Sequence, residues 1–339
     1  MTDPVSSRII GVEPAWAVPG ARVLLRGAGL PSAAPRPPVV RVGGSAAQVV
    51  LAGPSRIAFL VPADAGSGRR TVTVDDAPGE TALEVGAPVA TGLHQVDSPA
   101  FGPDGTLYAT FSGTRGQRVP VSVFRTGASG VTEPFVADLT NATSLAVDAA
   151  GALHVSSRFD GAVYRVSPDG TFEAVARELG VACGIAFGAD GTLYVGDRSG
   201  TIFRIGPSAR AIPFVSLPPS VAAFHLAVGP EEALFVTAPT LATRDHVYRV
   251  DRHGAVSVVS SEFGRPQGLA VADDGMLYVV DAVAGGAGLY LVASGRAREL
   301  VVSAPSLVGV AFDPGGGLAV ASVDTVYRLD VGLRPWSTR

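Results

Sequence analysis

Cysteine is almost absent from this sequence, because Cys183 is the only one among 339 residues. A single cysteine excludes an intramolecular disulfide framework and any zinc site built from several thiolates. Apolar residues, in contrast, make up 47% of the chain. We therefore expect the fold to be held together by the burial of apolar side chains.

Lysine is missing altogether, and the 26 basic residues are all arginine, against 30 acidic residues and a net charge of −4. No run of arginines is long enough to follow a phosphate backbone, so nucleic acid is not an expected partner. The arginine side chain favours planar, two-pronged contacts with carboxylates and phosphates. Individual arginines that the fold brings together are therefore candidate ligand-binding residues.

Long apolar runs are also missing. No stretch approaches the roughly 18 apolar residues of a membrane-spanning helix. The amino-terminal residues MTDPVSSRIIGVEP lack the basic segment and apolar stretch of a secretory leader. We expect no membrane span and a cytoplasmic location for the chain as written; a secreted chain whose leader had been removed would have the same sequence.

What the sequence does contain is a phrase repeated six times: a short apolar strand, a turn built on Asp-Gly or its remnant, and a second strand. Successive copies start 46, 40, 41, 43 and 41 residues apart. This period is typical of a four-stranded sheet that must stack on copies of itself to cover its faces. The sequence therefore predicts an all-β fold that contains a six-bladed β-propeller. The copies begin at Ser98, Ser144, Gly184, His225, Gly268 and Gly309.

The propeller is expected to occupy residues 87–339. The sixth repeat is followed only by Thr325–Leu329 and a short tail, so its blade lacks one strand. Residues 87–92 stand before the first repeat in the position of such a strand. We predict that they close the last blade and so remove the exposed sheet edges.

Residues 1–86 do not carry the repeat and show short alternating strands separated by Gly and Pro turns, a pattern typical of a small β-sandwich. The segment resembles the IPT/TIG family of immunoglobulin-like domains. The resemblance implies a spacer or interaction module without catalytic residues, which contacts a protein partner. It is carried by Glu13-Pro14, Pro19-Gly20, Gly27-Ala28-Gly29-Leu30, Val42-Gly43-Gly44, Val61-Pro62, and Gly68 followed by Thr71-Val72-Thr73-Val74.

The channel of a propeller is lined from the start of each inner strand. His225 occupies a repeat position that is Ser or Gly in the other blades, and Asp97 directly precedes the first repeat. Both are candidate catalytic residues, because unpaired polar groups in a buried channel are costly and must either satisfy one another or bind something. The residues directly before the six repeats are Asp97, Thr143, Cys183, Phe224, Gln267 and Val308.

The loops between second and third strands should rim the same face, and the first four carry arginine. One interpretation is ion pairing between neighbouring loops, which contributes little to stability. The arginines would be Arg115, Arg118, Arg158, Arg198 and Arg244, and the aspartates Asp160, Asp197 and Asp245. The other interpretation is a site for an anion or carboxylate. The candidate ligand-binding residues are Arg115, Gln117, Arg158, Asp160, Asp197, Arg198, Thr240 and Gln267.

Residues 88–330 resemble NHL-type propellers and, more closely, the SMP-30/gluconolactonase/strictosidine-synthase-like superfamily; with the IPT/TIG segment they are similar to bacterial gluconolactonase-like proteins. The resemblance implies a divalent metal held by a Glu, an Asn and an Asp, at positions that fall here on Asp97, Cys183 and Phe224. Phenylalanine cannot ligate a metal, so the usual set is incomplete. A different set, Asp97, Cys183 and His225, is a secondary metal hypothesis.

Three functions remain open at this point. The first is a binding or scaffold protein that recognises a small anionic or a peptidic ligand at the channel mouth. The second is a divergent lactonase or esterase, with or without a metal ion, in which Asp97 or His225 positions the metal or a water. The third is a structural assembly module.

Overall fold

The computed structural model describes residues 7–32, 36–293 and 296–336 and divides the chain into two compact units. One unit comprises Met1–Ala87 together with Leu300–Pro305, and the other comprises Pro88–Glu299 together with Ser306–Arg339. Across the described ranges, no helix has the length and apolar character needed to cross a membrane.

The first unit is a β-sandwich whose strands pair antiparallel except at the short β2. Fully buried side chains such as Leu25, Phe59 and Leu83 form its core. The strands, in the order β1-β3-β6-β5-β4-β7-β8-β2, are β1 (Arg8–Glu13), β2 (Trp16–Ala17), β3 (Arg22–Ala28), β4 (Val40–Val42), β5 (Ser45–Gly53), β6 (Arg56–Leu60), β7 (Gly68–Val74) and β8 (Ala77–Val85).

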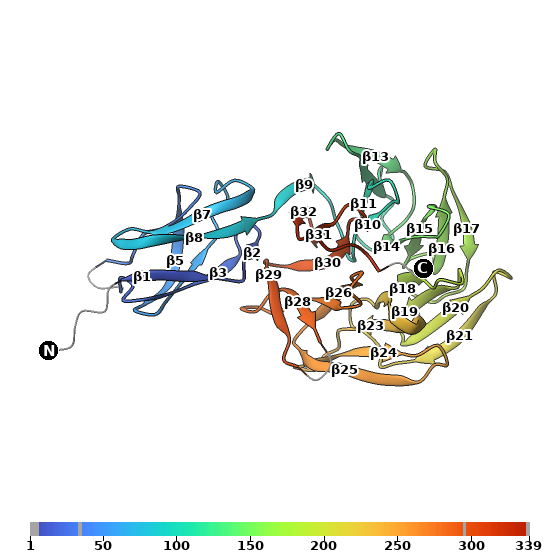
Figure 1. The fold of residues 1–339 in the computed structure, drawn as a ribbon. Helices are drawn as coiled ribbons and strands as arrows, with labels where there is room; N and C mark the ends of the chain where they lie inside the picture. The colour runs from blue at the N-terminus through green and yellow to red at the C-terminus, as the bar shows by residue number, and fades with distance from the viewer. Residues whose placement is uncertain (1–6, 33–35, 294–295, 337–339) are drawn as a thin grey trace. The chain divides into compact units, whose positions relative to one another are not determined.

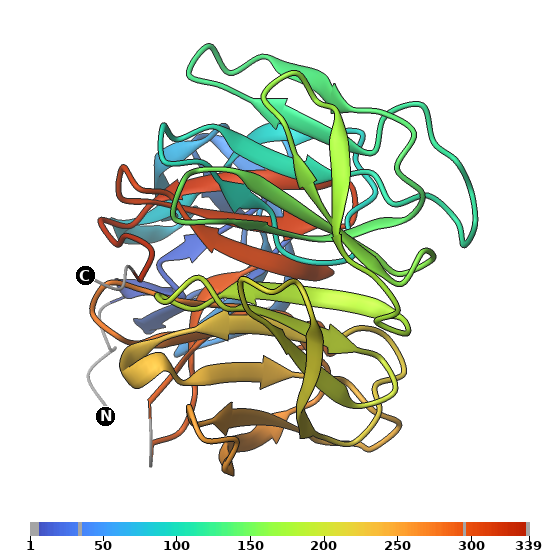
Figure 2. The same cartoon turned by 90° about the vertical axis from the view of Figure 1, so that its right-hand side faces the viewer.

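The second unit is a six-bladed β-propeller (Figures 1 and 2). The first four blades each contain four consecutive strands, most of which are labelled in Figure 1. They are β10 (Ala100–Phe101), β11 (Leu107–Thr110), β12 (Val123–Thr126) and β13 (Thr132–Val136); β14 (Ala142–Val147), β15 (Leu153–Ser157), β16 (Ala162–Val166) and β17 (Phe172–Ala176); β18 (Ala182–Phe187), β19 (Leu193–Asp197), β20 (Thr201–Ile205) and β21 (Ala211–Ser216); β22 (His225–Val228), β23 (Leu234–Thr237), β24 (Asp245–Val250) and β25 (Val256–Phe263).

The last two blades follow the same plan. The fifth is formed by β26 (Pro266–Val271), β27 (Leu277–Asp281) and β28 (Gly288–Val292), followed in the chain by β29 (Glu299–Ser303). The sixth contains β30 (Leu307–Phe312), β31 (Gly317–Ser322) and β32 (Thr325–Asp330). Its fourth strand is β9 (Ala87–Thr91). This strand lies beside β32 although more than 230 residues separate the two in the chain.

Neighbouring blades share their apolar cores. Val123, Val136 and Leu139 of the first blade are fully buried against Leu145 and Val155 of the second. Because each blade covers the face of the next, no blade buries its apolar side chains alone. This packing holds the ends of the strands in place, and the loops that they carry become fixed platforms for side chains.

The turns between inner and second strands follow from the Asp-Gly phrase. In the second blade the Asp148 carboxylate accepts hydrogen bonds from the backbone N–H groups of Ala150 and Ala152, both at 2.9 Å. Gly151 has φ +84°, a conformation that favours glycine. In the fourth blade the phrase is degenerate, and a short 3-10 helix, η1 (Pro230–Glu232), replaces the turn.

Strand register fixes which loops share a face. Ala142 at the start of β14 pairs with Ser157 at the end of β15, and Ala182 of β18 pairs with Asp197 of β19. The loops that follow the second strands therefore lie at the end of the channel where the inner strands begin. We call this end the mouth.

Candidate anion-binding mouth

Three arginines line one cavity at the mouth. Arg115, Arg158 and Arg198 come from the equivalent loops of the first, second and third blades. Together with Val181 and Ala222 they enclose about 220 Å³. Of the five rim arginines named from the sequence, the structure brings these three together, whereas Arg118 and Arg244 do not line the cavity.

The three guanidinium groups have no carboxylate partner within 4 Å in the described part of the chain. Arg158 donates one long hydrogen bond of 3.4 Å to the carbonyl oxygen of Gly113. Burial lowers the pKa of Arg158, and repulsion from Arg198 and Arg115 lowers it further, while Cys183 acts in the opposite direction. The cavity thus concentrates positive charge that the protein itself does not neutralise.

The rim aspartates bond within or beside their own loops instead. Asp160 accepts a hydrogen bond of 3.0 Å from the hydroxyl group of Tyr164. Asp197 accepts from the backbone N–H of Val181 at 2.8 Å and from the Ser199 hydroxyl group. These carboxylates hold the loops in shape, so the ion-pair interpretation fails for the arginines that line the cavity.

Two further predicted ligand-binding residues also act within their own loops. Gln117 accepts hydrogen bonds of 2.9 Å from both the backbone N–H and the hydroxyl group of Thr114. Thr240 donates to the Asp245 carboxylate from its backbone N–H at 3.1 Å and from its hydroxyl group at 2.6 Å. Neither residue lines the arginine cavity. Arg118 forms an exposed ion pair with Asp138 at 3.7 Å.

The loop that carries Arg115 is held by a residue that the sequence did not single out. Asn141 is fully buried, and its side-chain amide donates to the carbonyl oxygens of Ser112 at 2.7 Å and Thr114 at 2.8 Å. Its side-chain oxygen accepts from the backbone N–H of Gly116 at 2.7 Å. Asn141 has φ +49°, and the preference of asparagine for this conformation was the available signal.

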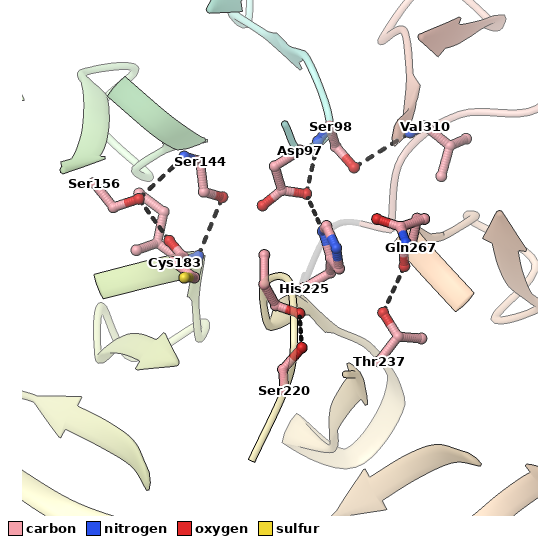
Figure 3. Close-up of polar contacts among 12 residues, drawn as sticks. Asp97, Ser98, Ser144, Ser156, Cys183, Ser220, His225, Thr237, Gln267 and Val310 are labelled. Carbon is pink, nitrogen blue, oxygen red and sulfur yellow. Dashed lines mark hydrogen bonds and ion pairs between the residues drawn. The ribbon is translucent and has the colours of Figure 1, made fainter. Parts of the chain in front are cut away.

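Asp97 and His225 meet inside the channel (Figure 3). His225 Nδ1 and Asp97 Oδ1 are 2.6 Å apart, and the two side chains are 1% and 5% exposed. His225 Nε2 is buried without a hydrogen-bond partner. The unpaired Nε2 indicates that Nδ1 carries the proton and donates to Asp97, which leaves Nε2 as an acceptor.

The remaining channel residues bond to the backbone. Cys183 donates from Sγ to the carbonyl oxygen of Val181 at 3.2 Å, and burial raises its thiol pKa to about 11. Thr143 donates to the carbonyl oxygen of Asn141 at 2.8 Å. The Gln267 side chain is buried, and its main-chain oxygen accepts from the Thr237 hydroxyl group (Figure 3).

The metal hypothesis gains no support from this arrangement. Among residues 7–32, 36–293 and 296–336, no group of three His, Cys, Asp or Glu side chains is placed to hold a metal ion. Asp97 and His225 are adjacent, but Cys183 Sγ donates to the carbonyl oxygen of Val181 and does not join them. The set Asp97, Cys183 and His225 is therefore not arranged as a site for a zinc-like ion.

Comparison with protein families finds two matches. The IPT/TIG domain model matches residues 7–85. The model for the amino-terminal part of strictosidine synthase-like proteins matches only residues 184–205, which cover β18 to β20. No curated protein matches.

Solved structures share the propeller fold at low identity. A gluconolactonase from Xanthomonas campestris is 16% identical, with a TM-score of 0.58 over 90% of this chain and 99% of that one. An auxiliary nutrient binding protein from Bacteroides ovatus is 15% identical, with a TM-score of 0.54 over 96% and 98%. Virginiamycin B lyase from Staphylococcus aureus is 13% identical, with a TM-score of 0.53 over 98% and 97%. The chain thus joins an IPT/TIG domain to a β-propeller structurally similar to those of the gluconolactonase/SMP-30 proteins and virginiamycin B lyase.

Proposed function

We propose that this protein binds a small anionic ligand, or the acidic end of a peptide, at the mouth of its propeller. The observation that carries the proposal is the cavity lined by Arg115, Arg158 and Arg198 with no carboxylate partner in the described part of the chain. The structural similarity to auxiliary nutrient binding proteins agrees with a binding role.

The electrostatics favour an anion over a neutral ligand. Like charges brought together repel, as the lowered pKa of Arg158 reflects. A bound carboxylate or phosphate would replace this repulsion with attraction. It would also accept paired hydrogen bonds from the planar guanidinium groups, which are among the stronger hydrogen bonds in proteins.

The test is calorimetric titration with acetate, succinate, citrate and inorganic phosphate at low ionic strength. Arg158→Ala and Arg198→Ala should each weaken binding of the best probe at least tenfold and shift the melting temperature little. Arg210→Ala is the matched control, because Arg210 is exposed in the turn between β20 and β21, at the opposite end of β20 from Arg198. No binding of any probe, or equal losses in all three variants, would contradict the proposal.

A second candidate function is a lactonase or esterase. It is favoured by the buried Asp97–His225 pair, in which a carboxylate orients an imidazole and leaves Nε2 free as a general base. A screen of lactones and esters, with and without divalent cations, tests this function. Turnover that is lost in His225→Gln but kept in Arg210→Ala would support it, and no turnover of any substrate would reject it.

A further inference from the structure

A second cavity opens at the end of the channel opposite the mouth. It encloses about 260 Å³ and shares no lining residue with the arginine cavity. The last residues of β14, β22, β26 and β30 line it, which places it where the inner strands end. Most of the side chains that line it are apolar, among them Leu145, Leu226, Leu269 and Phe312, although polar atoms make up the larger share of its exposed surface.

One acidic side chain reaches this apolar cavity. Asp97 lines it, although the carboxylate is only 5% exposed. Its Oδ1 accepts hydrogen bonds of 2.6 Å from the backbone N–H of Ser98 and from His225 Nδ1. Its Oδ2 accepts no hydrogen bond within the described residues.

The charge of Asp97 is not neutralised by its surroundings. In the tautomer that donates from Nδ1 and leaves the unpaired Nε2 as an acceptor, His225 carries no charge, and the pair as a whole keeps the negative charge of the carboxylate. No arginine of the described chain lies within ion-pairing distance of Asp97. A buried charge without a partner is costly, and a cationic group placed at Oδ2 would relieve that cost.

A tryptophan forms part of the cavity wall. Trp336 lines the cavity, and its indole Nε1 is buried without a hydrogen-bond partner. The residue is held in place by a hydrogen bond of 2.9 Å from its backbone N–H to the carbonyl oxygen of Val271, and by a bridge between Pro335 and Ala272. The cavity therefore offers one carboxylate oxygen of Asp97 among side chains that are mostly apolar or aromatic, a composition typical of small-molecule sites.

We propose that this cavity is a binding site for a small amine with an apolar or aromatic body. The ammonium group pairs with Asp97 Oδ2, and the body packs against the leucines and the Trp336 ring. This ligand differs in charge and in location from the anion at the mouth, so each site can be tested alone.

Trp336 provides the readout. The chain has only one other tryptophan, Trp16, in the first unit. In a Trp16→Phe background the fluorescence therefore reports on Trp336 alone. Benzylamine should produce a saturable change in emission, with a dissociation constant at least tenfold lower than that of benzyl alcohol, and benzoate should produce no such change. Equal responses to benzylamine and benzyl alcohol, or no response to either, would overturn the proposal.

Two variants test the contacts in that background. Asp97→Asn should reduce benzylamine affinity at least tenfold while keeping an acceptor for His225. Ala311→Leu should block binding by filling the cavity from β30 without altering the carboxylate. Arg210→Ala serves as the control, because Arg210 is exposed and lines neither cavity, and it should bind benzylamine as the parent does. Unchanged affinity in both cavity variants would locate the amine elsewhere and refute the assignment.

Discussion

Asp97 and His225 are 128 positions apart in sequence, yet their side chains meet at 2.6 Å inside the channel. They belong to the first and fourth blades, which face each other across a ring of six. Asp97→Ala would leave the buried Nδ1–H of His225 without an acceptor, and an unsatisfied buried group costs about 1–3 kcal/mol. We expect that loss in the free energy of unfolding, measured with urea.

The companion variant Asp97→Asn retains a side-chain oxygen for His225. Its free energy of unfolding should therefore fall clearly less than that of Asp97→Ala. If alanine and asparagine destabilise the protein equally, the hydrogen bond across the channel contributes nothing and the loss has another origin.

Asn141 should position the anion site without touching the ligand. Asn141→Ala removes three hydrogen bonds to the loop that carries Arg115 and places alanine at a positive φ. Asn141→Gly removes the same bonds but tolerates the backbone conformation. Both variants should weaken binding of the best anionic probe severalfold by calorimetry, and glycine should lose less stability. Full affinity in both variants would show that the loop keeps its shape unaided.

Because His154 is buried, we expect the protein to lose stability in mild acid. Its ring is buried against Phe187, at 4.8 Å between ring centroids, and burial lowers its pKa from the ordinary value of 6.5. Below about pH 6.5 the unfolded chain binds a proton that the folded chain does not, so the free energy of unfolding falls as the pH falls. It stops falling once the pH is below the folded pKa.

Urea unfolding of the parent and His154→Phe between pH 7.5 and pH 5 measures this dependence. Phenylalanine keeps the aromatic contact with Phe187 but cannot titrate, so the variant should show the shallower dependence on pH. Parallel curves for the two proteins would mean that other groups cause the acid sensitivity.

The fourth strand of the last blade lies far from the rest of that blade in sequence, which predicts the outcome of truncation. A fragment of residues 87–339 keeps β9 and should unfold cooperatively, by circular dichroism against temperature. A fragment of residues 98–339 leaves one edge of β32 unpaired and should unfold at lower temperature or aggregate. A stable monomer of the shorter fragment would contradict this role of β9.

The repeating architecture could be read from the sequence because it depends on local pattern. The six phrases recur at a nearly constant period, and an inner strand lies at or near the start of each copy, such as β22 (His225–Val228) at His225 and β26 (Pro266–Val271) at Gly268. Even the degenerate Pro230–Glu232 turn of the fourth blade keeps its place in the order of strands. The period therefore predicted the propeller, whereas the β-sandwich was expected from the alternating strands of residues 1–86.

Only part of the candidate site could be predicted from the sequence. The sequence placed arginines on one face, but which of them meet depends on loop shapes set by distant contacts, such as those of Asn141. Arg118 pairs with Asp138, whereas Arg115 three residues earlier lines the cavity. The contact of Asp97 with His225 could not be predicted from the sequence either, because no local sequence pattern encodes a hydrogen bond between opposite blades of the propeller.

The arginine cavity is built by the first three blades, and the loop before the fourth contributes Ala222. A ligand held there lies to one side of the channel axis, and the rims of the fifth and sixth blades take no part. Those two loops are residues 282–287, between β27 and β28, and residues 323–324, between β31 and β32. New side chains grafted onto them would widen the range of ligands that the mouth selects while the ring beneath stays unchanged.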